Sequence, residues 1–358
     1  MNFDNIKIII DANCNMHYCG FYVYGLQQVF AKKNIKFSFK EFENIVHINQ
    51  CLLFQIIDNS KIYNVAIDFH DSTNIDENVL IWSEIYAKIN LNQSLSTQSL
   101  GQLNDFNFNQ NWAKIISIPP SFGIRVFSLW QTIKHILLLL INIKWNSVSL
   151  VKNVILDNIR MYVKRLPISN YFHKNFTQNY VFMIASIWHK TTSYVNLSRA
   201  NFIRACKQNN KINISGGLVD IGYDCDYIPD LNDLTVGNTK ISLSEYIIKT
   251  QQSNFVFNCP SVAYCHGWKL SEYLCLGKAI ISTELSNDLP TPLIHGINIH
   301  FVKDDLHSMN EAVNYLLENP EYVKKLENGA QEYWKKYCEP SKIIETIIAK
   351  TLPFYGAS

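Results

Sequence analysis

The stretch from His266 to Ser282 constrains the fold of this chain more than any other segment. It reads His-Gly-Trp-Lys-Leu-Ser-Glu-Tyr-Leu-Cys-Leu-Gly-Lys-Ala-Ile-Ile-Ser. The pattern predicts a short helix that ends at Gly277 and runs directly into a buried strand. Lys269 and Glu272 are three residues apart on that helix and therefore share one face. We expect the ammonium and the carboxylate to point into the same cleft.

Strands and helices alternate in both halves of the chain. The expected strands are Ile6–Ile10, Lys36–Phe39, Tyr63–Asp68, Ile115–Ile118, Tyr180–Ser186, Lys211–Ser215, Asn254–Asn258 and Ile297–Val302. Residues Trp82–Tyr86 have a helical pattern. This alternation predicts an α/β fold with parallel sheets that helices cover on both faces. The simplest architecture is two Rossmann-like halves joined near residue 175.

A length of 358 residues leaves room for two domains of ordinary size. We expect an N-terminal Rossmann-like domain over 1–122 and a basic helical segment with a linker over 123–175. A C-terminal Rossmann-like domain over 176–358 would follow, with a last helix from Pro340 that packs back on the first domain. The fractions of hydrophobic residues (47%) and charged residues (17%) predict a folded chain.

Composition also limits the compartment and the partners. The net charge of +2 gives no reason to expect nucleic acid as a partner. Nine scattered cysteines fit reduced thiols in a cytoplasmic protein. The first residues lack the basic start and long apolar core of a signal peptide. The most apolar run, Ile136–Ile143, is far shorter than the ~20 residues that a spanning helix needs.

Two groups of cysteine and histidine side chains are close enough in sequence to consider a metal. They are Cys14, His17 and Cys19, and Cys259, Cys265 and His266. Neither group has the paired spacing of a structural zinc site. We therefore expect no metal.

The order of elements over residues 180–338 resembles the second domain of GT-B glycosyltransferases. The residues that carry the resemblance are Ser186, the helix with Ser198 and Arg199, Gly216-Gly217, the strand Phe255–Asn258, the helix with Lys269 and Glu272, Ile280–Ser282, Leu289-Pro290 and His295-Gly296. The resemblance implies a transferase that moves a sugar from a nucleotide-sugar donor to a glycan or lipid-linked acceptor. It implies no cofactor besides the donor, which is a co-substrate.

In this fold the nucleotide lies at the carboxyl ends of the second domain's strands, against helix starts that favour its phosphates. The resemblance assigns Lys269 to the diphosphate and Glu272 to the ribose hydroxyls. Gly267 would let the backbone approach the donor closely. The other expected donor-site residues are His266, Ser186, Arg199, Gly216 and Gly217.

The catalytic residues depend on the stereochemistry of the transfer. Many retaining GT-B enzymes carry two glutamates eight residues apart around this helix, and the position eight before Glu272 is Tyr264. The inverting route is therefore slightly favoured, and it needs a base from the N-terminal half. The candidates at strand carboxyl ends are Asp11, Asp68, His70 and Asp71, with the last three as the better cluster. The alternative is that these acids cap the next helix or turn.

Residues 123–166 are strongly basic. They contain one acid, Asp157, and seven cations, which gives a net charge of +6: Arg125, Lys134, Lys144, Lys152, Arg160, Lys164 and Arg165. One interpretation is a helical insertion with its own small core. The other is contact with an anionic membrane, with Trp130 and Trp145 in the interface. The sequence leaves both open.

Other functions remain compatible with the same residues. A Rossmann-type epimerase or synthase would act on the same sugar nucleotides. A non-catalytic binding protein would keep Lys269 and Glu272 without a functional acid or base. A dinucleotide dehydrogenase is disfavoured because no glycine-rich fingerprint follows the strand Ile6–Ile10.

Overall fold

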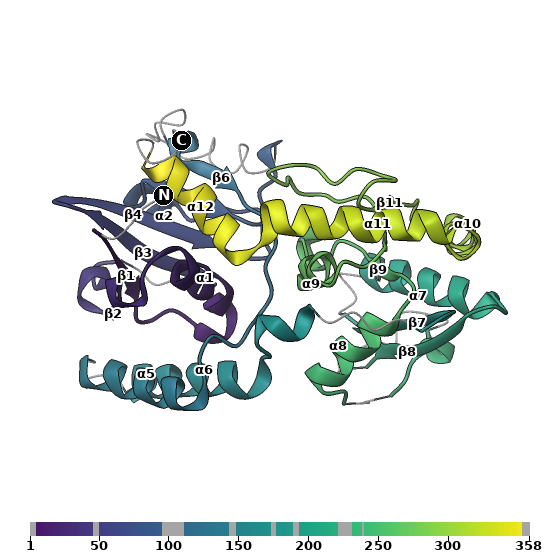
Figure 1. Cartoon of the computed structure of the whole chain (residues 1–358), viewed down its shortest axis with the longest axis horizontal. Coiled ribbons are helices and arrows are strands. Elements are labelled where there is room, and N and C mark those ends of the chain that lie inside the picture. Colours follow the sequence, from purple (N-terminus) through teal and green to yellow (C-terminus); the bar gives the residue numbers. More distant parts are fainter. Residues whose placement is uncertain are drawn as a thin grey trace. The chain divides into compact units, whose positions relative to one another are not determined.

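The computed structural model describes residues 5–45, 50–94, 111–142, 148–172, 177–188, 193–220, 231–237 and 240–352. The chain divides into two compact units. Unit 1 comprises Met1–Ile168, Asp288–Pro290 and Tyr337–Ser358, and unit 2 comprises Ser169–Asn287 and Thr291–Lys336. Figure 1 labels many of the helices and strands of both units.

Unit 1 is built on a six-stranded sheet in the order β2-β1-β3-β4-β5-β6. The strands are β1 (Ile6–Asp11), β2 (Ile35–Ser38), β3 (Cys51–Asp58), β4 (Lys61–Asp68), β5 (Ile85–Lys88) and β6 (Ile115–Ser117). All neighbours are parallel except β3, which is antiparallel to both β1 and β4. The expected parallel sheet is therefore present in this half, with β3 inserted as one antiparallel strand. Strand β3 was missed because its nearly continuous apolar run does not show the alternation of a half-buried strand.

The hairpin between β3 and β4 explains the antiparallel pairing. Asp58 pairs with Lys61, which leaves a two-residue turn. Its first residue, Asn59, has a φ of 55°. Asparagine tolerates this left-handed conformation, which matches the twist of a tight hairpin.

The helices of unit 1 that flank the sheet are α1 (Met16–Val29), α2 (Glu77–Trp82) and α12 (Pro340–Thr351). Asn15 caps α1 by accepting from His17 N. The helix expected over Trp82–Tyr86 was wrong in its second part, because α2 ends at Trp82 and β5 begins at Ile85. All four residues of β5 are buried, and periodicity alone cannot distinguish so short a run from helix.

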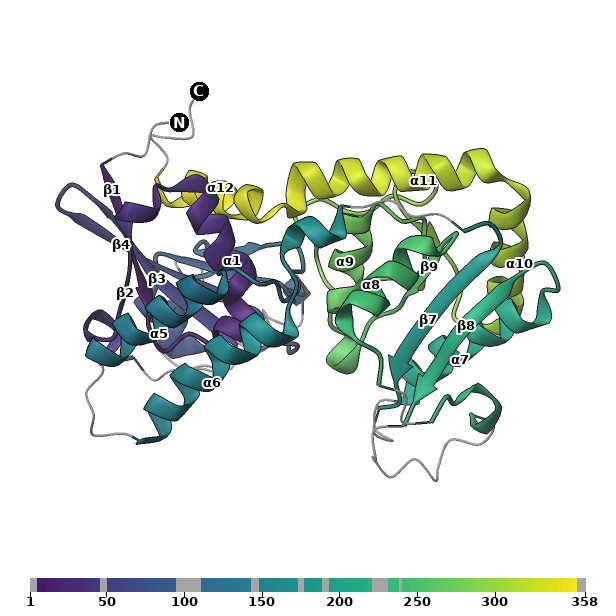
Figure 2. The ribbon, with the colours of Figure 1, turned by 60° about the horizontal axis from the view of Figure 1, so that its bottom comes forward.

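Two further helices, α5 (Leu129–Asn142) and α6 (Val148–Lys164), form the basic segment. Leu139 of α5 and Val154 of α6 pack with Ala12 against Phe37 and Phe39 beside edge strand β2. Figure 2 shows α5 beside β2 and α6 beside α1, and the two helices also pack on each other. Lys144 and Trp145 lie outside the described residues. Among the described residues, no helix has the length and apolarity that crossing a bilayer requires.

Unit 2 contains two groups of parallel strands. They are β7 (Tyr180–Ser186) with β8 (Asn213–Val219), and β9 (Val256–Asn258) with β10 (Ile280–Ser282) and β11 (His300–Phe301). Strand β7 lies beside β9, and Asn254 N donates to Tyr180 O at 2.7 Å where the two strands begin. The strands therefore follow the order β8-β7-β9-β10-β11, and the winding reverses between β7 and β9. A doubly wound fold binds its ligands at such a point.

The helices of unit 2 are α7 (Ser193–Gln208), α8 (Leu243–Gln252), α9 (Trp268–Leu276), α10 (Leu306–Glu318) and α11 (Pro320–Tyr333), and a π-helical turn, Trp334–Cys338, follows α11. Gly277 ends α9 with a φ of 61°, a conformation that glycine adopts without strain. Strand β10 begins three residues later. This confirms both the predicted helix-to-strand element and the α/β class of the chain.

The C-terminal helix α12 packs on α1 within unit 1. Gly25 makes this close approach possible, because a Cβ there would lie 2.4 Å from Pro340 O and 2.9 Å from Ile344 Cγ1. We predict that Gly25→Val lowers the free energy of unfolding by ~1–3 kcal/mol through overpacking. Urea denaturation measures the change, and Gln28→Ala at an exposed position of α1 is the control. Equal stability of both variants would show that this contact does not hold α12 in place.

Candidate functional site

A cavity of about 160 Å³ opens at the carboxyl ends of β7 and β9. It is lined by Met183, Arg199, Phe257, Asn258, Cys259, Ser261, Gly267, Trp268 and Lys269. The first turn of α9 forms one wall, so the unpaired N–H groups and positive dipole end of this helix are close by. This is the place where the strand order predicts a ligand.

Two cationic side chains from different helices meet at this cavity. Lys269 Nζ, on α9, donates to the carbonyl oxygen of Ile184. Arg199 Nη1, on α7, donates to the carbonyl oxygen of Ser186 at 2.9 Å. Both acceptors lie at the carboxyl end of β7. The structure thus brings together four of the residues assigned to the donor site: Lys269, Arg199, Ser186 and Gly267.

The cavity is electropositive. Burial and the nearby Arg199 guanidinium lower the pKa of Lys269 to about 8, so its ammonium is still mostly charged at neutral pH. None of the described residues that line the cavity is acidic. An anion bound here would relieve the repulsion between the two cations and would be held by charge-assisted hydrogen bonds.

Glu272 lies one turn further along α9 and faces a different neighbour. It is 7% exposed, and its Oε2 accepts a hydrogen bond of 3.0 Å from Tyr246 on α8. Glu272 is not among the residues that line the cavity. Lys269 lines the cavity and Glu272 does not, so the two side chains do not share one cleft as their helix spacing predicts.

The remaining predicted donor-site residues lie at different depths. His266 is buried just before α9. Gly216 and Gly217 lie inside β8, which continues to Val219, and neither lines the cavity. A Cβ on Gly216 would come within 2.1 Å of Met183 O, and one on Gly217 within 2.5 Å of Leu234 O. Close packing explains these two glycines.

An aromatic pair next to the cavity was missed by the sequence analysis. Tyr264 is 54% exposed, and its ring stacks on that of Tyr194 with centroids 4.3 Å apart. Tyr194 also donates to the carbonyl oxygen of the cavity residue Ser261 at 2.8 Å. Ala263 and Tyr264 both have positive φ, which costs backbone strain in residues other than glycine. No pattern in the sequence predicts this conformation.

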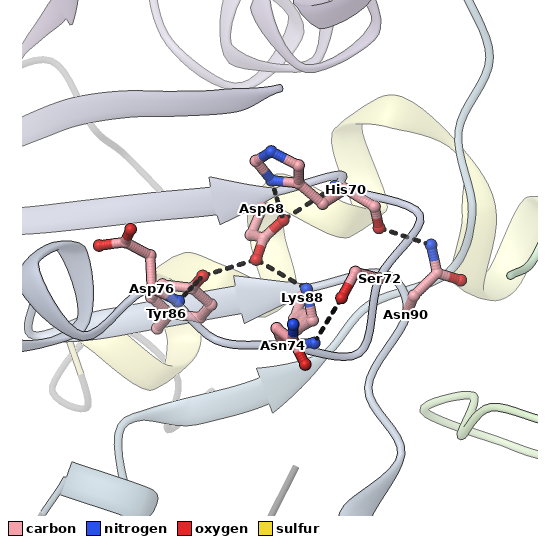
Figure 3. Close-up of polar contacts among 8 residues, drawn as sticks. All are labelled: Asp68, His70, Ser72, Asn74, Asp76, Tyr86, Lys88 and Asn90. Carbon is pink, nitrogen blue, oxygen red and sulfur yellow. Dashed lines mark hydrogen bonds and ion pairs between the residues drawn. The ribbon is translucent and has the colours of Figure 1, made fainter. Parts of the chain in front are cut away.

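In unit 1 the predicted acid Asp68 is the centre of a buried network, drawn in Figure 3. It ends β4 and is 2% exposed. Its Oδ2 accepts from Lys88 Nζ at 2.7 Å and from Tyr86 OH at 2.5 Å, and its Oδ1 accepts from His70 N at 2.8 Å. Lys88 and Tyr86 are two residues apart on β5 and therefore share a face of the sheet.

The network keeps Asp68 ionised. Burial alone would raise the pKa of this carboxyl, but the charge of Lys88 and the hydrogen bonds from His70, Lys88 and Tyr86 outweigh it and lower the pKa below its ordinary value. An ionised carboxylate only accepts hydrogen bonds. His70 Nδ1, 3.1 Å from Asp68 Oδ1, must therefore carry a proton, which leaves Nε2 as the basic nitrogen.

The other candidates in unit 1 differ in exposure. The His70 side chain is 33% exposed, and its second ring nitrogen faces away from Asp68 in Figure 3. Asp71 is exposed. Asp11 is fully buried at the end of β1, where its Oδ1 accepts from Asn13 N at 2.8 Å. Strand β3 lies between β1 and β4, so Asp11 is two strands, or about 10 Å, from Asp68.

The part of the chain that the structure describes contains no group of side chains suited to bind a metal ion. No three His, Cys, Asp or Glu side chains gather there in a way that could hold an ion. The eight described cysteines are free thiols and all are buried: Cys14, Cys19, Cys51, Cys206, Cys259, Cys265, Cys275 and Cys338. His17 instead has its Nε2 2.7 Å from an Arg165 guanidinium nitrogen.

No family model matches this chain, and no curated protein matches it. Among solved structures it is similar to a glycosyltransferase from Rickettsia africae, with 12% identity over 82% of this chain and 71% of that one and a TM-score of 0.45. Anabaena HepE in complex with UDP has the same identity and TM-score, over 80% and 72%. S. aureus TarM in complex with fondaparinux, alpha-GlcNAc-glycerol and UDP matches 94% of this chain and 58% of that one, with 12% identity and a TM-score of 0.44.

We predict that the Asp68–Lys88 pair is a condition of folding in unit 1. Asp68→Asn or Lys88→Met leaves one buried partner uncompensated and should cost ~3–5 kcal/mol of unfolding free energy. The double variant should cost less than the sum of the two changes. Urea denaturation measures all three, with the exposed Asp71→Asn as the control.

The Asp68–Lys88 pair should also make the free energy of unfolding depend on pH in the acid range. Because folding lowers the pKa of Asp68, its stabilisation is present above the ordinary carboxyl pKa of ~3.9 and is lost as pH falls through the folded value. The difference in stability between the native chain and the double variant should therefore shrink below about pH 4. A difference that stays constant down to acid pH would contradict this assignment.

Proposed function

We propose that this protein is a glycosyltransferase that moves a sugar from a nucleotide-sugar donor to a glycan or lipid-linked acceptor. In this proposal unit 2 binds the donor, and unit 1 holds the acceptor and supplies the base. The donor is a co-substrate, and the transfer needs no further cofactor. The observation that carries the proposal is the electropositive cavity at the switch point between β7 and β9.

The chemistry of the cavity suits a nucleoside diphosphate. Lys269 and Arg199 supply two cationic donors, and the start of α9 adds backbone N–H groups. Glu272, one turn along the same helix, would accept from ribose hydroxyls, since a carboxylate has about four lone-pair sites. The exposed face of Tyr264 would offer a stacking surface to a ring of the donor.

His70 is the base in this proposal, and Asp68 positions it. His70 Nε2 would take the proton of the acceptor hydroxyl as the acceptor oxygen bonds to the anomeric carbon of the donor sugar. The bond between that carbon and the diphosphate oxygen breaks, and the nucleoside diphosphate leaves with the electron pair. The transfer would therefore invert the anomeric configuration. The ionised Asp68 fixes the tautomer and stabilises the imidazolium that forms.

The basic segment supports contact of unit 1 with an anionic membrane. Helix α5 exposes Trp130 (78%), Ile133 (40%), Leu137 (56%) and Ile141 (77%), spaced three and four residues apart so that they form one stripe. Apolar residues on one face of a helix with lysines beside them suit the interface of an anionic bilayer. A lipid-linked acceptor would be reached from this position.

The donor site is tested by titrating the protein with a panel of sugar nucleotides, the free nucleoside diphosphates and the nucleosides. We predict that Lys269→Ala weakens binding of diphosphates about ten- to hundred-fold, the ~1.5–3 kcal/mol of a charged hydrogen bond, and leaves nucleoside affinity unchanged. Lys325→Ala, an exposed lysine of α11, removes the same charge elsewhere in unit 2 and should have no effect. Unchanged diphosphate affinity in Lys269→Ala would refute the donor site.

Catalysis is tested by the release of free nucleotide with and without added acceptors. His70→Ala should lower acceptor-dependent turnover by ~10²–10⁴-fold because general base catalysis is lost. Donor affinity should not change, and Asp71→Asn should keep full activity. Full turnover in His70→Ala would exclude His70 as the base. Donor binding without any transfer in the native protein would indicate a binding protein.

A further inference from the structure

A second and larger cavity, of about 860 Å³, lies in unit 1 along edge strand β2. Strand β2 forms one side and α5 the other, and the two elements lie in contact. None of the residues assigned above to the donor, the base or its network lines this cavity. Its volume is in the upper part of the ~300–1,000 Å³ range of small-molecule sites.

The floor of this cavity is apolar. It is lined by Phe37 from β2 and Phe39 just after it, by Leu138 and Leu139 from α5, and by Phe127 just before α5. Leu139 is only 4% exposed and joins the small core beside β2, so the floor is a fixed part of the fold. A hydrocarbon chain would find aromatic and aliphatic contacts here.

The rim of the cavity is cationic. Four lysines line it, Lys32, Lys36, Lys40 and Lys134, against two glutamates, Glu41 and Glu43. All four lysines are exposed, and a lysine can keep its ammonium group in solvent while its apolar stem lies along an apolar surface. The excess of positive charge favours a ligand with an anionic head.

One buried polar atom in the wall, His135 Nε2, has no hydrogen-bond partner among the described residues. His135 is 9% exposed. Its ring lies between aromatic neighbours, with centroids 4.4 Å from Phe37 and 4.9 Å from Phe127. Burial lowers the pKa of His135 to about 4, so the imidazole is neutral at physiological pH. Buried polar groups are normally satisfied, and a polar ligand atom would satisfy this one.

The exposed stripe of α5 adjoins the mouth of the cavity. Leu138, which lines the cavity, follows directly on Leu137 of the stripe, and Lys134 of the rim follows Ile133. A membrane surface that covers the stripe would therefore present lipid at the cavity. Lipids combine an apolar chain with a charged head, which is the combination that the floor and the rim recognise.

We propose that this cavity binds an acidic lipid from a membrane surface, with a hydrocarbon chain on the floor of phenylalanines and leucines and the phosphate at the lysine rim. The site does not depend on sugar transfer or on the donor cavity of unit 2. Lipid binding here would add a specific anchor to the general attraction between a basic helix and an anionic bilayer.

The probe for this site is dodecyl phosphate, titrated below its critical micelle concentration. Saturable binding with one site per chain is expected, and neither inorganic phosphate nor dodecyl maltoside should compete effectively. Leu138→Glu places a carboxylate in the wall at a half-exposed position and should reduce affinity at least ten-fold. Ile141→Glu, on the stripe and outside the cavity, is the matched control. It should keep probe binding and weaken cosedimentation with anionic vesicles.

The charge of the rim is tested separately. Lys36→Glu with Lys40→Glu should lower affinity for the probe at least ten-fold, and the effect should shrink with added salt. Lys33→Glu is the control, because Lys33 is exposed and follows Lys32 but does not line the cavity. It should leave the affinity for the probe unchanged. Absence of saturable binding, equal binding of the uncharged detergent, or equal affinity in all variants would each overturn the proposal. Donor affinity should be unchanged throughout.

Discussion

Two cations that converge on the carboxyl end of one strand organise unit 2. Lys269 and Arg199 come from different helices, yet both donate to backbone carbonyls of β7, at Ile184 and Ser186. These bonds tie α7 and α9 to the sheet at the point where the strand order reverses. They also leave two partly desolvated positive charges side by side, a cost that the fold bears and that a bound anion reverses. Structure and proposed donor binding thus rest on the same pair of side chains.

Unit 1 handles buried charge in the opposite way. Lys88 is fully buried and its charge is balanced within the fold by Asp68. Because the carboxylate stays ionised, it also determines which nitrogen of His70 carries the proton. The buried pair thus also orients a partly exposed imidazole, which is the base in the proposed transfer. Among the candidates Asp68, His70 and Asp71, this arrangement favours His70 as the proposed base and Asp68 as the residue that positions it.

Part of this arrangement could be predicted from the sequence and part could not. The helix that ends at Gly277 was predictable because helical spacing and a terminal glycine are local signals. Lys269 and Arg199 followed from the order of elements. The partners of Asp68 did not, because Tyr86 and Lys88 come from β5, and long-range pairing leaves no periodic trace. The available clue was Lys88 itself, because a lysine at the end of a buried strand needs a buried carboxylate as its counter-ion. The strained Tyr264 and the cavity beside β2 depend on tertiary packing alone.

The account depends most on where a nucleotide binds. A crystal structure of the chain with a nucleoside diphosphate measures this directly, as the distances from the phosphate oxygens to Lys269 Nζ and to the Arg199 guanidinium. We predict hydrogen bonds of ~2.7–3.2 Å to both side chains, with the diphosphate at the start of α9. A diphosphate bound elsewhere, with neither side chain in reach, would contradict the proposed donor site.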